Sequence, residues 1–234
     1  MVDWTEGLAV SNRGLSEEPV FQTRSVHFIP PTVDCQRFDQ TGGDAREAHS
    51  LSNGQPVIGV IGKIDEGRGF EEVIEAFARI SGTFENSRLM IVGQGVYQTV
   101  LEDEAASRGV AESIIWTGYR DDDLADHYRA MDVLLYARPG SEEGHRATIE
   151  ALACGVPVVS LPVCGMDTVL GDLAPDLASR DETSAALADK AIEVLVGRPS
   201  DLADRCASRA REFDYERTSA RLTALYGSTK RPSG

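Results

Sequence analysis

From about residue 56 onward, short apolar runs alternate with amphipathic stretches along this chain. The runs are rich in Val, Ile and Leu, and they are apolar throughout instead of at alternate positions. Strands that are buried on both faces have this pattern, which is typical of a parallel sheet covered by helices on both sides. The sequence therefore predicts five strands of one parallel sheet, over residues 57–62, 88–93, 113–118, 132–137 and 156–162.

The stretches between these runs have the spacing of helices. In the first of them, apolar residues recur on one helical face, namely Phe70, Val73, Ile74, Phe77 and Ile80. Further helices are predicted over 97–108, 122–131, about 145–154 and within 181–226. Because strands and helices alternate in this way, we expect an α/β domain with a Rossmann-like, doubly wound parallel sheet.

Charge and composition exclude several kinds of function. The formal net charge of −15 argues against binding of nucleic acid through a basic surface, because a polyanion would be repelled. No apolar run approaches the roughly 20 residues of a membrane span, and no basic region followed by an apolar stretch opens the chain. We therefore expect a cytoplasmic protein. The cysteines, which lack metal-ligand spacing and are interpreted as reduced and structural, are Cys35, Cys154, Cys164 and Cys206.

The segment after the first predicted strand is a candidate binding site. In parallel α/β sheets, ligands bind beyond the carboxyl ends of the strands. There, the run GKIDEGRG (62–69) places Lys63 and Arg68 around a glycine-rich turn that opens a helix. Two cations and the backbone N–H groups of a helix start form a site for phosphate oxygens. The alternative is that both side chains are merely solvated.

A second glycine turn, formed by Gly93 and Gly95, follows the second predicted strand. A tight turn alone would explain it. The dinucleotide-binding pattern G-x-G-x-x-G does not follow the first strand, which counts against an enzyme that uses NAD or FAD. The pattern G-x-x-x-x-G-K-[ST] of nucleotide-hydrolysing enzymes is also missing from the sequence.

Residues 137–159 form the most informative stretch of the chain. Glu142 precedes a predicted helix, and Glu150 lies eight residues later inside it, among small and apolar residues. A buried carboxylate is costly unless it is hydrogen-bonded or paired, and a ligand hydroxyl would satisfy it. Alternatively, Glu150 pairs with a protein donor and Glu142 caps the helix. Three aspartates at 121–123 precede another helix and are interpreted as caps instead of metal ligands.

Taken in order, these segments resemble the donor site of the GT4-type retaining glycosyltransferases, which have the GT-B fold. The run E-x7-E followed by ALACGVPVV carries the resemblance, together with GK-x4-RG at 62–69, RLMIVGQG at 88–95 and WTGY at 116–119. The segments IPPTVD, AMD at 130–132 and FDYER at 213–217 occur in the family's order. The match extends over about residues 7–226.

The resemblance implies a role for each candidate residue. Lys63 and Arg68, beside Gly62, would hold the diphosphate of a nucleotide sugar. Glu150 would bind the ribose, and Glu142 would meet hydroxyls of the transferred sugar. Catalysis would rest on Glu142, Lys63 and Arg68, with no metal and no other cofactor. The remaining donor-binding positions would be the backbone of Gly144, His145 and Arg146, which would cradle the sugar and phosphates, and Tyr119, Arg120, Gly93 and Gly95, which would lie around the base.

The resemblance also implies a domain organisation. Residues 7–11 resemble the last strand of the family's N-terminal domain, so we expect residues 1–25 to be a remnant of that domain or a linker. Residues 26–226 would form the donor-binding domain with its C-terminal helices, and residues 227–234 a disordered tail. An N-terminal acceptor-binding domain or subunit would complete the cleft that catalysis needs. Alone, this chain is expected to bind a donor weakly and to transfer little sugar.

Two other functions stay open on the sequence alone. A degenerate half of such an enzyme could scaffold a partner without turnover. A nucleotide-sugar epimerase shares the fold, but it needs further acids and bases from the cleft. Binding of UDP, GDP or ADP distinguishes an enzyme from a scaffold, and conversion of UDP-GlcNAc without an acceptor distinguishes an epimerase from a transferase.

Overall fold

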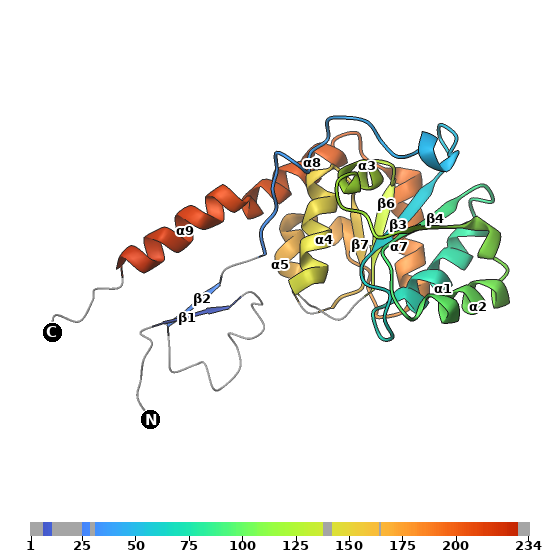
Figure 1. The fold of residues 1–234 in the computed structure, drawn as a ribbon, viewed down its shortest axis with the longest axis horizontal. Helices are drawn as coiled ribbons and strands as arrows, with labels where there is room; N and C mark the ends of the chain where they lie inside the picture. The colour runs from blue at the N-terminus through green and yellow to red at the C-terminus, as the bar shows by residue number, and fades with distance from the viewer. Residues whose placement is uncertain (1–6, 11–24, 29–30, 138–141, 164, 229–234) are drawn as a thin grey trace, which may run out of the picture.

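The computed structural model describes residues 7–10, 25–28, 31–137, 142–163 and 165–228 (Figure 1). At its centre is a five-stranded sheet in which every neighbouring pair of strands is parallel. This confirms the predicted Rossmann-like, doubly wound fold. In spatial order the strands are β5 (Ile114–Gly118), β4 (Arg88–Val92), β3 (Val57–Ile61), β6 (Val133–Tyr136) and β7 (Val158–Ser160).

The order of the strands reverses between β3 and β6. From β3 the chain adds β4 and β5 on one side of the sheet, and it then returns to add β6 and β7 on the other side. The connections that leave β3 and β6 therefore go to opposite sides, which opens a crevice at the carboxyl ends of these two strands. This crevice is where a ligand site is expected in such a sheet.

Helices cover both faces of the sheet. Figure 1 shows α1, α2 and α7 on one side and α4, α5 and α8 on the other, in agreement with the contacts between them. The apolar face predicted for the first helix is buried. No helix among the described residues is both long and apolar enough to cross a lipid bilayer. The bounds are α1 (Phe70–Ser81), α2 (Gln98–Ser107), α3 (Leu124–Arg129), α4 (Glu142–Ala153), α5 (Met166–Leu170), α6 (Ala174–Leu177), α7 (Ser184–Gly197), α8 (Leu202–Ala210) and α9 (Tyr215–Ser228).

Two parts of the helical layer differ from the sequence prediction. Helix α4 begins at Glu142, which makes that residue part of the helix instead of the loop before it. Residues 166–177 form α5, the 3₁₀-helix η4 (Gly171–Leu173) and α6, none of which was predicted. Each of these pieces is too short to show a helical repeat of apolar residues.

The segment before β3 packs against the C-terminal part of the chain. The N–H of Val33 donates to the carbonyl of Phe213 at 3.0 Å, and the N–H of Tyr215 donates to the carbonyl of Val33 at 3.0 Å. Phe38 is buried in the core. Upstream, β1 (Gly7–Val10) and β2 (Ser25–Phe28) pair in parallel as a separate two-stranded sheet.

Asp132 of the AMD segment fastens the start of the central strand. Its carboxylate accepts from the N–H of Val57 at 2.8 Å, and its own N–H donates to the carbonyl of Val57 at 2.8 Å. Arg46 adds an ion pair to the same carboxylate at 3.5 Å. The motif therefore has a structural role at the amino end of the sheet, away from the carboxyl-end crevice.

The described cysteines have free thiols, as the sequence predicted. Cys154 and Cys206 are buried, and Cys35 is partly buried. Burial raises the pKa of the Cys154 and Cys206 thiols to about 12, so both stay protonated and unreactive at neutral pH. Cys164 lies outside the described residues.

Candidate functional site

A pocket opens at the carboxyl ends of β3 and β6, where the strand order reverses. The space within it is about 400 Å³, a volume that includes open solvent. Its walls are the end of β3 with the following glycine turn, the start of α1, the end of β6 and one residue of α4. Among the residues that line it are Gly62, Lys63, Arg68, Phe70, Tyr136 and Ala147.

The pocket contains both of the cations predicted from the sequence. Lys63 follows β3 directly; its side chain is 66% exposed, and its ammonium pairs with Asp65 at 2.7 Å. Arg68 precedes Gly69, the N-cap residue of α1, which also lines the pocket. Two positive side chains and the positive end of a 12-residue helix thus converge on one pocket. This arrangement favours an anion with several oxygens, such as a phosphate.

The ion pair between Lys63 and Asp65 does not prevent anion binding. The Lys63 side chain is mostly exposed while that of Asp65 is 25% exposed, so water reaches the pair and screens the attraction, and exposed pairs contribute about 0–1 kcal/mol. An incoming phosphate, with more charge and more acceptor oxygens, can therefore replace the carboxylate of Asp65.

Gly93 and Gly95 have a structural role that the sequence did not reveal. The loop after β4 crosses the loop after β3, and the N–H of Ile64 donates to the carbonyl of Gln94 at 3.1 Å. A Cβ on Gly93 would overlap with the carbonyl oxygen of Gly62, and a Cβ on Gly95 would overlap with that of Ile64. The glycines therefore let two backbones touch. Neither of them is among the residues that line the pocket.

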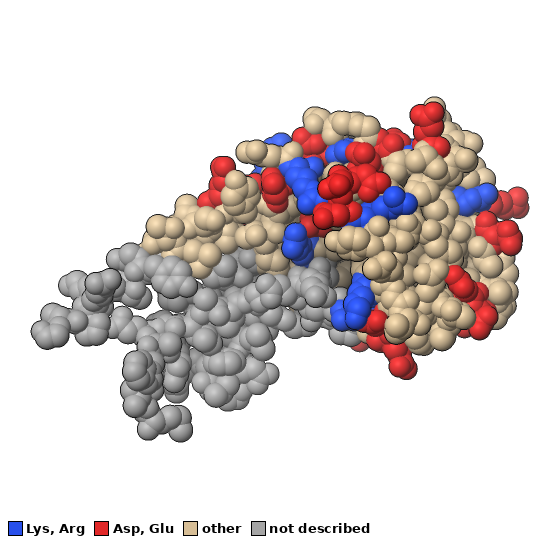
Figure 2. Space-filling model, in the orientation of Figure 1, with Lys and Arg blue, Asp and Glu red and all other residues tan. Residues whose placement is uncertain are grey.

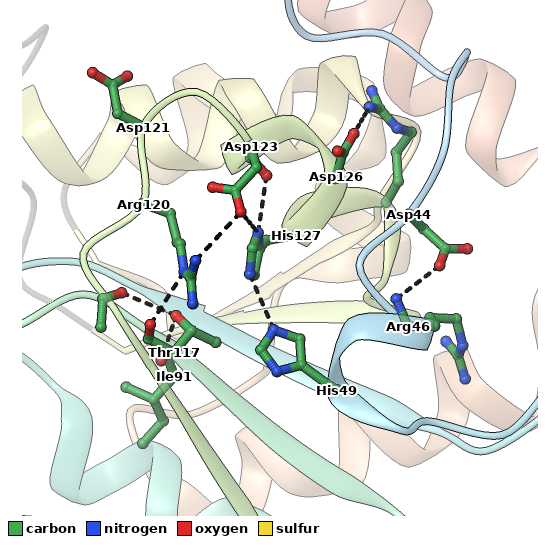
Figure 3. A network of polar contacts seen from close by, with 12 residues as sticks. Asp44, Arg46, His49, Ile91, Thr117, Arg120, Asp121, Asp123, Asp126 and His127 are labelled. Atoms are coloured by element: carbon green, nitrogen blue, oxygen red, sulfur yellow. Dashed lines mark hydrogen bonds and ion pairs between the residues drawn. The ribbon is translucent and has the colours of Figure 1, made fainter.

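Tyr119 and Arg120 follow β5, an edge strand of the sheet, and they are not among the pocket-lining residues either. Tyr119 is 66% exposed. The guanidinium of Arg120 donates to the carbonyl of Thr117 at 3.1 Å and pairs with Asp123 at 3.4 Å (Figure 3). The structure leaves the aromatic ring of Tyr119 available and holds Arg120 against its own loop.

The start of α4 contributes a buried histidine. Glu142 and Gly144 are in the first turn of this helix, and the side chain of Glu142 lies outside the described part of the chain. His145 is buried, with its ring centroid 6.5 Å from that of Tyr136. A Cβ on Gly165 would overlap with the His145 ring, so this ring packs directly on the backbone that follows β7. His145 thus links the pocket wall at Tyr136 to that backbone.

Glu150 is buried, as predicted, and it has protein partners. Its side chain is 8% exposed, the Tyr128 hydroxyl donates to its Oε2 at 2.9 Å, and Nε of Arg146 donates to its Oε1 at 3.1 Å. Burial raises the pKa of Glu150, and the hydrogen bond from Tyr128 and the charge of Arg146 oppose that rise. The structure thus gives Glu150 the protein donors that the alternative interpretation expected. Glu150 lies one turn beyond Ala147 and is not among the residues that line the pocket.

The sequence did not reveal a histidine pair near Arg120 (Figure 3). Nε2 of His49, in η2 (Glu47–His49), lies 3.1 Å from Nε2 of His127 in α3. Nδ1 of His127 faces the backbone carbonyl of Asp123 at 2.9 Å. A carbonyl can only accept, so Nδ1 carries the His127 proton and His49 donates to Nε2 of His127. The two residues are 78 positions apart, and no local pattern connects them.

This pair makes stability depend on pH. Burial, followed by the nearness of His127 and Arg120, lowers the pKa of His49, so the unfolded chain takes up the proton at a higher pH than the folded chain does. Stability is therefore complete above about pH 6.5, the usual histidine value, and falls as the pH decreases towards the lower pKa of the folded state. We expect the free energy of unfolding in urea to fall less between pH 8 and pH 5 for His49→Gln than for the wild type. An equal fall in both proteins would contradict this assignment.

The aspartates at 121–123 do not cap α3 as predicted. Asp123 occupies the N-cap position, but its side chain accepts no hydrogen bond from a helix N–H. It pairs with Arg120 instead, and Asp121 pairs with Arg37 at 2.6 Å. Capping is replaced here by ion pairs across the loop. In the described part of the chain, no three His, Cys, Asp or Glu side chains are placed to hold a metal ion together.

The charges on the face shown in Figure 2 are mixed. Lys and Arg side chains are interleaved with Asp and Glu, and no continuous basic area is visible on this face. On the face shown, no wide positive surface attracts anions.

These observations define an α/β domain with a pocket lined by Lys63 and Arg68 where the strand order reverses. The chain belongs to the family described as Glycosyl transferases group 1, whose model matches residues 43–213. This confirms the resemblance found in the sequence.

Relatives from bacteria agree with this family. The chain is 31% identical over 227 residues to a D-inositol 3-phosphate glycosyltransferase of Xylanimonas cellulosilytica, covering 88% of this chain and 52% of the relative. It is 26% identical over 211 residues to a 2-deoxystreptamine glucosyltransferase of Streptomyces kanamyceticus, covering 87% of this chain and 54% of the relative. The chain thus spans about half the length of these relatives.

Solved structures share the fold. The sucrose-phosphate synthase of Thermosynechococcus elongatus has a TM-score of 0.81 at 21% identity, with 94% of this chain and 57% of that chain covered. The Anabaena protein HepE in complex with UDP-glucose has a TM-score of 0.82 at 17% identity, with 97% of this chain and 65% of that chain covered. At these identities the likeness shows the fold alone, which is that of the GT-B glycosyltransferases.

Proposed function

We propose that this chain is the donor-binding half of a retaining glycosyltransferase that takes its sugar from a nucleoside diphosphate sugar. The convergence of Lys63, Arg68 and the N-terminus of α1 on one pocket is the observation that carries this proposal. Two structures of the Anabaena protein HepE, which shares this fold, support it, because that protein is in complex with UDP-glucose in one of them and with UDP and glucose in the other.

The arrangement suits departure of a diphosphate. When the bond between the anomeric carbon and the diphosphate oxygen breaks, negative charge grows on the diphosphate. Lys63, Arg68 and the N–H groups at the start of α1 are already in place to stabilise that charge, so little reorganisation is needed. In the proposed enzyme Glu142 and the backbone at Gly144–Arg146 contact the sugar, and Glu150 contacts the ribose.

The acceptor is bound elsewhere in this proposal. Residues 26–226 form the donor-binding domain, and residues 1–25 belong to a linker or to the end of a preceding domain. An acceptor-binding domain or subunit completes the cleft, because the curated relatives are about twice as long as the matched part. The chain by itself then binds the donor weakly and transfers little sugar.

Nucleotide titration followed by thermal melting tests the proposal. At a concentration of 100 times Kd, one of UDP, GDP or ADP should add about 2.7 kcal/mol of stability, which raises Tm by roughly 5–10 °C. Arg68→Ala should lose most of that shift, because it removes a charge-assisted contact to the diphosphate.

Arg79→Ala is the matched control. Arg79 is in the last turn of the same helix, where it forms an exposed ion pair with Asp189, so its loss should leave the nucleotide shift unchanged. If none of the three nucleotides raises the Tm of the wild type, the proposal is overturned and a scaffold without turnover is favoured. Conversion of UDP-GlcNAc to its 2-epimer without any acceptor would identify an epimerase instead.

A further inference from the structure

The carboxylate of Glu150 is held from two sides that differ in mobility. On the inner side, the hydroxyl of Tyr128 donates to Oε2 at 2.9 Å, and Tyr128 is fully buried. On the outer side, Nε of Arg146 donates to Oε1 at 3.1 Å, and the Arg146 side chain is 64% exposed. One oxygen therefore has a fixed partner, and the other has a partner that can exchange with solvent or with a ligand.

Packing fixes the position of the Tyr128 ring. The ring meets Phe38 edge to face, with centroids 5.9 Å apart and an interplanar angle of 80°. The preceding residue, His127, joins α3 to η2 through His49, and the following residue, Arg129, donates to the carbonyl of Gly43 at 2.7 Å. Helix α3 is thus anchored on both sides of Tyr128, and the hydroxyl cannot follow a moving carboxylate.

The same contact determines the charge and orientation of Glu150. Burial and the carboxylate of Glu150 raise the pKa of Tyr128 well above its usual value, so this phenol stays protonated and acts as a donor. Burial raises the pKa of Glu150, while Tyr128, Arg146 and the charge of Arg37 oppose that rise. Loss of the phenol would both free the carboxylate to rotate and favour its protonation.

We propose that Tyr128 is a positioning residue, which fixes the carboxylate of Glu150 so that Oε1 accepts a hydrogen bond from a ribose hydroxyl of the bound nucleotide. This rests on the proposed function. Tyr128 does not touch the nucleotide. The ribose hydroxyl takes the place of Arg146 on Oε1, which releases an exposed side chain at low cost.

The test measures the affinity of Tyr128→Phe and of the wild type for UDP, GDP and ADP. Each nucleotide is compared with its 2′,3′-dideoxy analogue, and the measurements are made between pH 5 and 8. The wild type should prefer the ribose form by about tenfold or more, as expected for hydrogen bonds to a charged group. Tyr128→Phe should lose most of this preference, with the affinity for the dideoxy analogue unchanged. Its binding of the ribose form should also weaken at a higher pH than in the wild type, because Glu150 then protonates more readily.

Phe38→Leu separates positioning from packing. This substitution loosens the packing of the Tyr128 ring without removing the hydroxyl, so it should lower Tm but reduce the preference for ribose less than Tyr128→Phe does. If Tyr128→Phe does not fold, Glu150→Gln serves in its place. A neutral amide then replaces the carboxylate, so the hydrogen bond with the ribose hydroxyl is no longer charge-assisted and the preference should fall.

The outcomes distinguish this inference from the proposed function. A wild type that binds none of the nucleotides overturns both. Two outcomes overturn only the role of Tyr128. In the first, the wild type binds a nucleotide but does not prefer its ribose form. In the second, Tyr128→Phe keeps both this preference and the pH dependence of the wild type.

Discussion

Gly93→Ala should destabilise the fold by roughly 2–6 kcal/mol, which is a large part of the total stability of a domain. Two effects add. The backbone of Gly93 has φ of 144°, where a side chain is strained by about 1–3 kcal/mol. In addition, the new Cβ would overlap with the carbonyl oxygen of Gly62, and this backbone atom is held because the N–H of Gly62 donates to the carbonyl of Val92 at 3.0 Å. Overpacking of this kind costs about 1–3 kcal/mol more.

A second glycine provides the control for backbone strain. Gly109 has φ of 74°, and a Cβ there meets nothing within 4 Å, so Gly109→Ala should cost only the strain. Urea unfolding of both variants measures the difference, which is the contribution of the crossing between the loops after β3 and β4. If Gly93→Ala is no less stable than Gly109→Ala, the two backbones do not touch as described. Because Gly62 lines the pocket, the surviving folded fraction of Gly93→Ala should also bind nucleotide less tightly.

The parts of the fold that were predictable are those encoded locally. Continuous apolar runs such as Val57–Ile61 and the one-sided face of α1 follow from residues close together in the sequence. The short helices of residues 166–177 were missed because their position depends on packing against distant elements. Arg209, for example, donates to the carbonyl of Val169 at 2.9 Å across 40 residues.

The candidate site divides in the same way. Lys63 and Arg68 were found because both lie in one loop after a strand, and the rule for parallel sheets then places them at a ligand site. Tyr128 was missed because its partner Glu150 is on another helix, 22 residues away, and its neighbour Phe38 is on the segment before the sheet. Gly93 and Gly95 were noticed in the sequence. Glycine is needed there because the loop after β4 touches the loop after β3, and this contact cannot be read from the sequence.

Removal of both pocket cations should abolish nucleotide binding at practical concentrations. Each charge-assisted contact to a phosphate contributes about 1.5–3 kcal/mol, so Lys63→Ala and Arg68→Ala should each lower the affinity for UDP, GDP or ADP by roughly 10- to 100-fold. The double variant should lower this affinity by about 10²- to 10⁴-fold. Because the two side chains line one pocket, the effects are expected to be coupled, and a double-mutant cycle measures that coupling.

The number of phosphates on the ligand tells whether these cations act on the diphosphate. Calorimetry should compare a nucleoside with its monophosphate and its diphosphate. In the double variant, each added phosphate should no longer increase the affinity, while the weak affinity for the nucleoside is unchanged. The affinity of the wild type for the diphosphate should also fall with increasing salt. The affinity of the double variant should depend little on salt, because Lys63 and Arg68 are the main source of the salt dependence. Equal losses for nucleoside and diphosphate would mean that the two residues only support the shape of the pocket.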